Sequence, residues 1–199
     1  MSIQKLEHAL VLSFNDALGE ALEHYRIMDE SSFRYLFTRK LCGQLGQEVK
    51  TAREHEKMDL VAVYNKIKCA FEFKFYDTRL RLDINNACDS TKRKGGPSPK
   101  NRDEVCNSFS NLNDKKEYDC KYFILVAIDR YKAPSKFADD YYFENENKLI
   151  NFLVENAKVN KNNKITRVDI KFLSKVHFQL KEAEIFGWMC RLEEPKDKV

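Results

Sequence analysis

Three charged side chains in residues 57–76 have the types and spacing for metal-assisted chemistry. Asp59 precedes one apolar run, and Glu72 and Lys74 interrupt a second apolar run. Carboxylate oxygens are preferred ligands of Mg²⁺ and Mn²⁺, and a neighbouring lysine can stabilise negative charge on a phosphate. The segment is therefore a candidate metal site, and the alternative is a β-hairpin with one face in water.

The second apolar run separates its charged residues from its phenylalanines. Side chains alternate between the two faces of a strand, so Glu72 and Lys74 share one face while Phe71, Phe73 and Phe75 share the other. Such alternation is common wherever one face of a strand is solvated. The spacing of the glutamate and the lysine alone therefore does not distinguish a catalytic strand from an ordinary amphipathic one.

The two apolar runs are expected to pair as an antiparallel hairpin. The polar break at 65–66 suits a two-residue turn, which pairs Tyr64 with Ile67. This register places Asp59 directly opposite Glu72, with Cβ atoms about 5 Å apart. Two carboxylates at that separation repel each other unless a cation lies between them.

The surrounding pattern predicts one α/β (α+β) domain over residues 1–199, with a central mixed β-sheet flanked by helices. We expect an N-terminal helical segment over 1–28 that is interrupted near Gly19, then a core over 30–175. Asp29 to Ser32 predicts the start of the first core helix. The expected strands and later helices are, in order, strands 48–54, 59–64 and 68–76, helix 103–116, strand 121–129, helix 144–157, strand 167–176 and a further strand near 187–192.

Composition limits the classes of function. The chain is 43% hydrophobic and 33% charged, which is typical of a folded protein and not of a disordered tail. Neither a signal peptide nor a bilayer-spanning segment is expected. The six cysteines form no C-x-x-C pair, so we expect reduced thiols and a cytoplasmic location. The four histidines are dispersed, which argues against a zinc site.

Positive charge is concentrated directly after the hairpin. Residues 77–102 contain seven lysines and arginines against three aspartates, an excess equal to the net charge of +4 of the whole chain. This segment is expected to be a basic loop that contacts nucleic-acid phosphates, although a solvated loop has the same composition. The candidate nucleic-acid-binding residues are Lys50, Arg53, Arg79, Arg81, Lys92, Arg93 and Lys94.

Asp59, followed by Glu72-Phe73-Lys74 on a hydrophobic strand, resembles the D…(D/E)-x-K signature of the PD-(D/E)xK nuclease superfamily, which has the restriction-endonuclease-like fold. The predicted order of elements over 30–175 is similar to the αβββαβ core of that fold. Met58 stands where the name of the family has proline. The resemblance is to a superfamily pattern and not to one particular protein.

The resemblance implies roles for individual residues. Asp59 and Glu72 would bind a catalytic Mg²⁺ or Mn²⁺ together with the backbone carbonyl of Phe73, and Lys74 would act on the attacking water. Many members of the superfamily add a glutamate from the helix before the sheet. Glu30 is the first candidate for this glutamate, and Glu23 is the second.

The implied function is that of a metal-dependent DNA endonuclease of a restriction or defence type, acting as a homodimer or with a partner subunit. One alternative is a catalytically silent nucleic-acid-binding or nuclease-partner protein with the same fold. Another is an unrelated α/β protein that has an exposed charged hairpin. The position of Asp59 relative to Glu72 distinguishes this last alternative, because the nuclease hypothesis fails if the two residues lie on opposite faces of the sheet or far apart.

Overall fold

A computed structural model describes seven segments of the chain, which together include all the elements discussed below. These are residues 3–23, 29–55, 57–77, 99–129, 146–156, 169–180 and 184–193. Within these segments, no helix combines the length and the apolar character needed to cross a bilayer.

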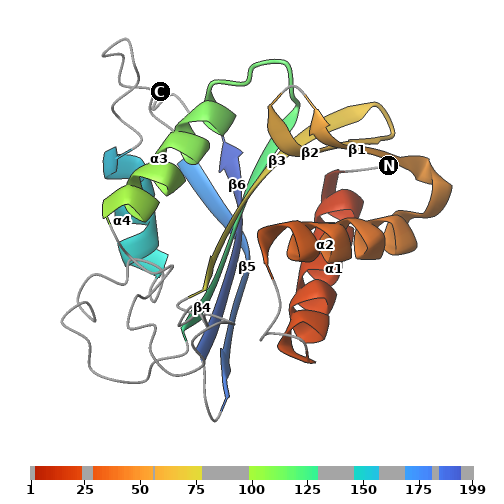
Figure 1. Ribbon diagram of the computed structural model, residues 1–199. Helices are drawn as coiled ribbons and strands as arrows, with labels where there is room; N and C mark the ends of the chain where they lie inside the picture. The colour runs from red at the N-terminus through yellow and green to blue at the C-terminus, as the bar shows by residue number, and fades with distance from the viewer. Residues whose placement is uncertain are drawn as a thin grey trace, which may run out of the picture.

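Six strands form one mixed sheet in the order β1-β2-β3-β4-β6-β5 (Figure 1). β3 and β4 pair in parallel and the other neighbours are antiparallel, so β6 lies between two strands that precede it in the chain. The predicted α+β class with a central mixed sheet is thereby confirmed. The strands are β1 (Val49–His55), β2 (Met58–Tyr64), β3 (Ile67–Asp77), β4 (Cys120–Asp129), β5 (Asp169–Gln179) and β6 (Glu184–Glu193).

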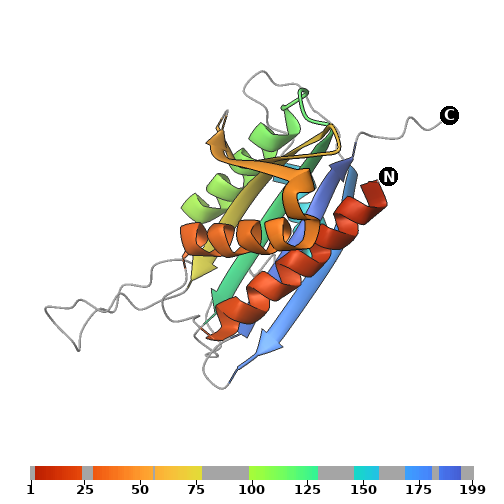
Figure 2. The ribbon, with the colours of Figure 1, turned by 90° about the vertical axis from the view of Figure 1, so that its right-hand side faces the viewer.

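Helices cover both faces of this sheet (Figures 1 and 2). α1 (Ile3–Glu23) and α2 (Glu30–Leu45) pack on one face, and a short 3-10 turn η1 (Gly46–Glu48) connects α2 to β1. α3 (Pro99–Asn113) and α4 (Glu146–Asn156) pack on the other face. Each face of the sheet therefore has its own hydrophobic cluster.

Two helices differ from their predicted extents. α1 continues through Gly19, where a break was expected, because its buried stripe extends past this residue to Ala21. α3 begins at Pro99 and not at Asp103, so the last four residues of the expected basic loop 77–102 are helical. Proline suits the first turn of a helix, where its missing N–H is not needed.

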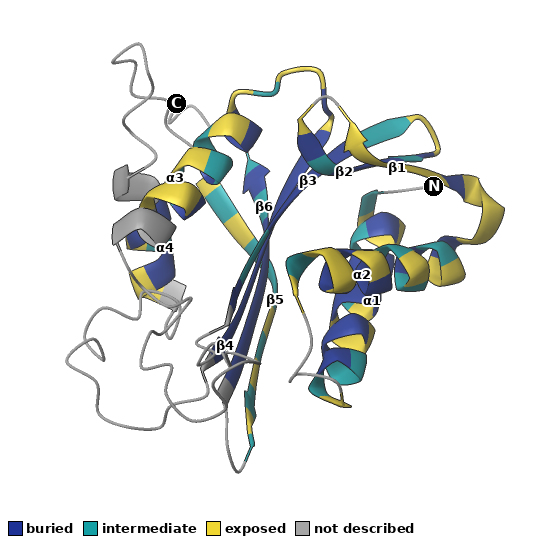
Figure 3. Cartoon of the chain, viewed as in Figure 1, coloured by how far each residue is buried: buried dark blue, intermediate teal, exposed yellow. Residues whose placement is uncertain are grey.

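β4 is the central strand of the core. Tyr122, Ile124 and Val126 belong to the cluster beneath α1 and α2, and Phe123 and Leu125 belong to the cluster beneath α3 and α4. Figure 3 shows this interior as a continuous buried region of the sheet. The continuous apolar run of the sequence predicted burial on both faces, and this prediction is confirmed.

α2 is fixed against β3 by its aromatic residues. Asp29 caps the helix, since its side chain accepts a hydrogen bond from the backbone N–H of Ser32 at 2.7 Å. The predicted helix start is therefore confirmed. The Phe33 ring contacts Phe73, and the Phe37 ring contacts both Phe71 and Phe73. These contacts place the first turns of α2 over the middle of β3.

The predicted hairpin turn between β2 and β3 is confirmed. Asn65 and Lys66 both have positive φ, at 49° and 70°, which is the backbone of a type I′ turn. Tyr64 pairs with Ile67, as predicted, and the ladder continues to the pair of Leu60 with Phe71. The turn thus sets the register that positions the candidate site.

Replacing Lys66 with glycine should stabilise the protein, because the left-handed backbone is unfavourable for lysine and not for glycine. We expect the free energy of unfolding of Lys66→Gly to rise by about 1 kcal/mol in chemical denaturation. The control is Lys68→Gly, two residues along in β3, which should lower it by about 0.5–1 kcal/mol. Destabilisation by Lys66→Gly would contradict the type I′ turn.

Candidate active site

The candidate site lies where β2 and β3 stop pairing. The backbone N–H of Phe73 donates to Oδ2 of Asp59 at 2.8 Å, and that of Phe75 donates to Oε2 of Glu30 at 3.2 Å. A buried backbone N–H that loses its neighbouring strand needs another acceptor. Two carboxylates, one from β2 and one from α2, take the place of the missing strand.

The expected direct opposition of Asp59 and Glu72 is corrected by this arrangement. The ladder ends at Leu60 and Phe71, one residue before that pair. Beyond this point β2 remains paired with β1, and the carboxylate of Asp59 bonds to the backbone of Phe73. Asp59 is thus next to Glu72 in the site, but through the backbone of β3 and not through a cross-strand pair.

Glu72 contacts α3 and is buried, and Lys74 beside it is only partly exposed. Glu72 is only 8% exposed, and its carboxylate hydrogen-bonds the side chain of Ser108 on α3. The Nζ atom of Lys74 lies 3.6 Å from Oε1 of Glu72. The charged face of this strand is therefore buried, which argues against the solvated hairpin.

The carboxylates of the site influence one another's protonation. Burial, and after it the charge of Asp59, raise the pKa of Glu72 to about 7, and the charge of Lys74 opposes this increase. Burial also raises the pKa of Glu30, against the charge of Lys74, and Asp59 adds to the increase. Three carboxylates and one lysine thus form a single electrostatic cluster.

Arg34 is a member of this cluster that the sequence analysis missed. Its Nη1 atom lies 2.8 Å from Oδ1 of Asp59, and its Nη2 atom lies 3.1 Å from Oε1 of Glu54. Arg34 is buried, and it follows Glu30 by four residues on α2, so the two side chains share one helix face. The four-residue spacing of Glu30 and Arg34 was the feature of the sequence from which Arg34 could have been predicted as a site residue.

The other expected site residues are placed as follows. Lys50 and Arg53 are exposed on β1, and the guanidinium of Arg53 lies 5.9 Å from the ring centre of Tyr35. Glu23 is an exposed residue at the end of α1, so Glu30 is the helical glutamate that contacts β3. The candidates Arg79, Arg81, Lys92, Arg93 and Lys94 lie outside the described residues.

The donor atoms of the site suit a hard divalent cation. Asp59, Glu72 and the carbonyl of Phe73 would supply oxygen ligands, and Mg²⁺ commonly binds through one or two carboxylates and keeps several waters. In the part of the chain that the structure describes, His, Cys, Asp and Glu side chains form no group of three or more that could hold a metal ion. Any ion would therefore depend on these two carboxylates and the backbone.

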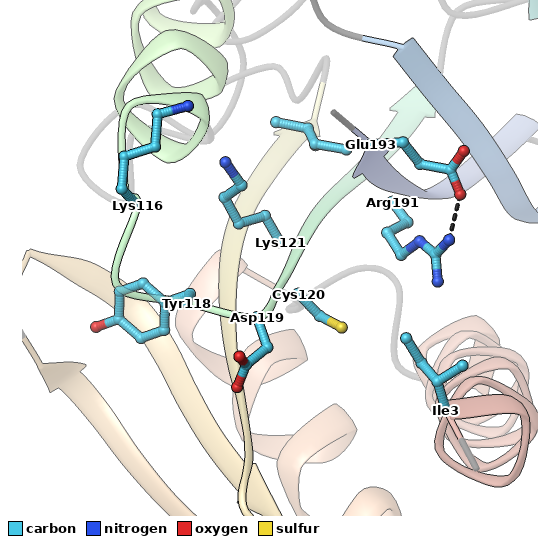
Figure 4. A pocket seen from close by; sticks show the side chains of 9 residues that line it. Ile3, Lys116, Tyr118, Asp119, Cys120, Lys121, Arg191 and Glu193 are labelled. Carbon is cyan, nitrogen blue, oxygen red and sulfur yellow. Dashed lines mark hydrogen bonds and ion pairs between the residues drawn. The ribbon is translucent and has the colours of Figure 1, made fainter. Parts of the chain in front are cut away.

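A cavity of about 410 Å³ lies away from these carboxylates (Figure 4). Cys120 and Lys121 at the start of β4, together with Arg191 near the end of β6, contribute to its lining. Lys74, in contrast, pairs in register with Leu125 further along β4. The cavity is therefore separate from the candidate site.

The cysteines of the described residues are free thiols. They are Cys42, Cys69, Cys106, Cys120 and Cys190.

Comparisons of the chain with protein-family models, with curated proteins and with solved structures give no match.

The buried Glu72 should make the stability of the metal-free protein depend on pH. The folded state binds this proton more tightly than the unfolded chain, because the pKa rises from 4.5 to about 7 on folding. The free energy of unfolding should therefore fall as pH rises through this range, by an amount on the order of 3 kcal/mol.

The test is chemical denaturation in the presence of a chelator at several pH values. Glu72→Gln should be as stable as wild type near pH 4.5 and more stable at pH 8, because the glutamine carries no charge to bury. Glu117→Gln, at an exposed position, should follow the wild-type profile. Parallel pH profiles for wild type and Glu72→Gln would refute the raised pKa.

Proposed function

We propose that this protein is a metal-dependent endonuclease that hydrolyses DNA phosphodiester bonds, of the restriction or defence type that the PD-(D/E)xK resemblance implies. The observation that carries the proposal is the hydrogen bond of Asp59 to the backbone of Phe73, between Glu72 and Lys74. It brings the three signature side chains to one point of the sheet from two strands. The burial of Glu72 beside Ser108 of α3 favours a chemical role over solvation.

Each residue of the cluster has a distinct role in this proposal. Asp59, Glu72 and the carbonyl of Phe73 would hold Mg²⁺ or Mn²⁺, which when bound would supply positive charge for the phosphate and lower the pKa of a water. Lys74 orients the attacking water and stabilises charge that develops on the phosphate oxygens. Glu30 fixes the backbone of β3 through Phe75, so it acts as a positioning residue.

DNA is the proposed partner, and its phosphates would contact basic residues near the site. The exposed side chains of Lys50 and Arg53 extend from β1, the edge strand beside β2. The five basic residues proposed within 77–102 would add further contacts. A homodimer or a partner subunit would allow both strands to be cut, and the free thiols are consistent with the proposed cytoplasmic location.

A catalytically silent nucleic-acid-binding protein of the same fold is a second candidate. The observation that favours it is the ion pair of Arg34 with Asp59, since a positive side chain already satisfies the carboxylate. On this alternative the protein would bind DNA without cleaving it. Cleavage and binding assays on the same preparation distinguish the two candidates.

Purified protein should nick or linearise supercoiled plasmid only when Mg²⁺ or Mn²⁺ is present. Asp59→Asn, Glu72→Gln and Lys74→Ala should each lower the rate by about 100-fold or more, because each removes a charge that acts on the reacting groups. Asparagine is preferred to alanine at position 59 because its side-chain oxygen can still accept from Phe73. Gel electrophoresis of a plasmid time course measures the rates.

The matched control is Lys68→Ala, on the same strand as Lys74, which should cleave at the wild-type rate. Cleavage that survives in Asp59→Asn or Glu72→Gln would refute the assigned site. Plasmid retention without cleavage, together with no calorimetric binding of Mn²⁺, would support the silent DNA-binding protein.

A further inference from the structure

Arg34 is the positively charged partner of Asp59. The arginine is 8% exposed, and its guanidinium bridges Asp59 of β2 and Glu54 of β1. Buried arginines need acidic partners, because an unpaired charge is strongly unfavourable away from water. The contact between Arg34 and Asp59 is therefore a stable feature of the metal-free fold.

Both carboxylate oxygens of Asp59 already have partners. Oδ1 accepts from Arg34 at 2.8 Å, and Oδ2 accepts from the backbone N–H of Phe73 at 2.8 Å. The bond to Phe73 is part of the support for β3. A divalent cation would displace the bond to Arg34, because the guanidinium and the ion would be two positive charges beside a single carboxylate and would repel each other.

Glu54 provides Arg34 with a second acidic partner. Its side chain is 76% exposed, so it can move with the guanidinium. The backbone of Glu54 has a positive φ of 52°, which is unusual for a glutamate within a strand. Strained backbone of this kind occurs at functional sites and in regions that change conformation.

Because Glu54 is a second acidic partner whose side chain can move, an arginine that moved away from Asp59 would remain paired with Glu54.

We propose that Arg34 is an internal counter-cation of the site. It holds Asp59 in place while no metal is bound. When a divalent cation binds, Arg34 leaves Asp59 and remains paired with Glu54. Arg34 is thus a positioning residue that lowers the apparent metal affinity. This inference rests on the proposed function, since it concerns the same metal site.

The proposal makes metal binding a competition between two cations for one carboxylate. Removing the charge of Arg34 should remove the competitor, so the affinity for metal should increase. Coupling between linked binding events typically changes affinity by roughly 5- to 100-fold, and we expect Arg34→Gln to fall in this range. The same substitution should destabilise the metal-free protein, because Asp59 then lies near Glu30 and Glu72 without its counter-charge.

The test is a calorimetric titration with Mn²⁺, together with thermal melting in chelator and in Mn²⁺. Arg34→Gln should bind Mn²⁺ more tightly than wild type, melt at a lower temperature in chelator and gain more from Mn²⁺. Arg34→Lys, which keeps the charge, should bind close to wild type. Arg39→Gln is the matched control, because Arg39 lies on the same helix but pairs with Glu20 at 2.6 Å, outside the site.

Glu54→Gln is the second variant, chosen because an exposed side chain can be changed without loss of folding. It should weaken Mn²⁺ binding, since the released arginine would lose its alternative partner. If wild type binds Mn²⁺ and Arg34→Gln binds it no more tightly, the proposal is overturned, and the proposed metal site is not affected. Equal heats for wild type, Arg34→Gln and Asp59→Asn would instead show that no metal binds at Asp59, and the proposed function would fail first.

Discussion

The structure around the candidate site depends on the satisfaction of two backbone N–H groups of β3. β2 pairs with β3 only from Leu60 onward, so the N–H groups of Phe73 and Phe75 do not face β2. A buried N–H without an acceptor is strongly unfavourable, so side chains must replace the strand. Asp59 and Glu30 do this, and their negative charges are consequently brought together beside Glu72. The same constraint that completes the sheet thus creates the charge cluster.

Charge balance then follows from this arrangement. Three carboxylates in a partly buried region repel one another, and Arg34 and Lys74 reduce the repulsion from opposite sides of β3. Burial keeps the interactions strong, since water cannot screen them as it does at a surface. The protein therefore stores a local excess of negative charge that a divalent cation could relieve. That property is independent of any fold resemblance, and it is the physical basis of the proposed metal site.

The sequence predicted those features that depend on local pattern. The alternation along β3, the turn at Asn65-Lys66 and the long apolar run of β4 each reflect short-range periodicity, and the structure confirms them. The end of the β2–β3 ladder was not predictable, because there the side chain of Asp59, and not its backbone, bonds to Phe73.

The burial of Glu72 was not predictable either, because Ser108 lies far along the chain on α3. Arg34 was missed for a related reason. From the sequence alone, Arg34 would be assigned to the solvent-exposed face of its helix, because its partner Asp59 on β2 is known only from the structure. The sequence therefore located the carboxylates and the lysine, while the neighbours that tune them came from tertiary contacts.

The position of β6 between β4 and β5 has a consequence for synthesis of the protein. Ribosomes release the chain from its N-terminus, so the amphipathic α1 emerges long before residues 184–193, which it must cover together with β5. Gly187 lies so close to α1 that a side chain there would clash with Leu18 and Phe14, which shows how tightly these distant segments meet. Until β6 arrives, the edge of β4 and the part of α1 around Phe14 and Leu18 that packs on Gly187 remain uncovered. Such long-range closure slows folding and exposes surfaces that chaperones recognise.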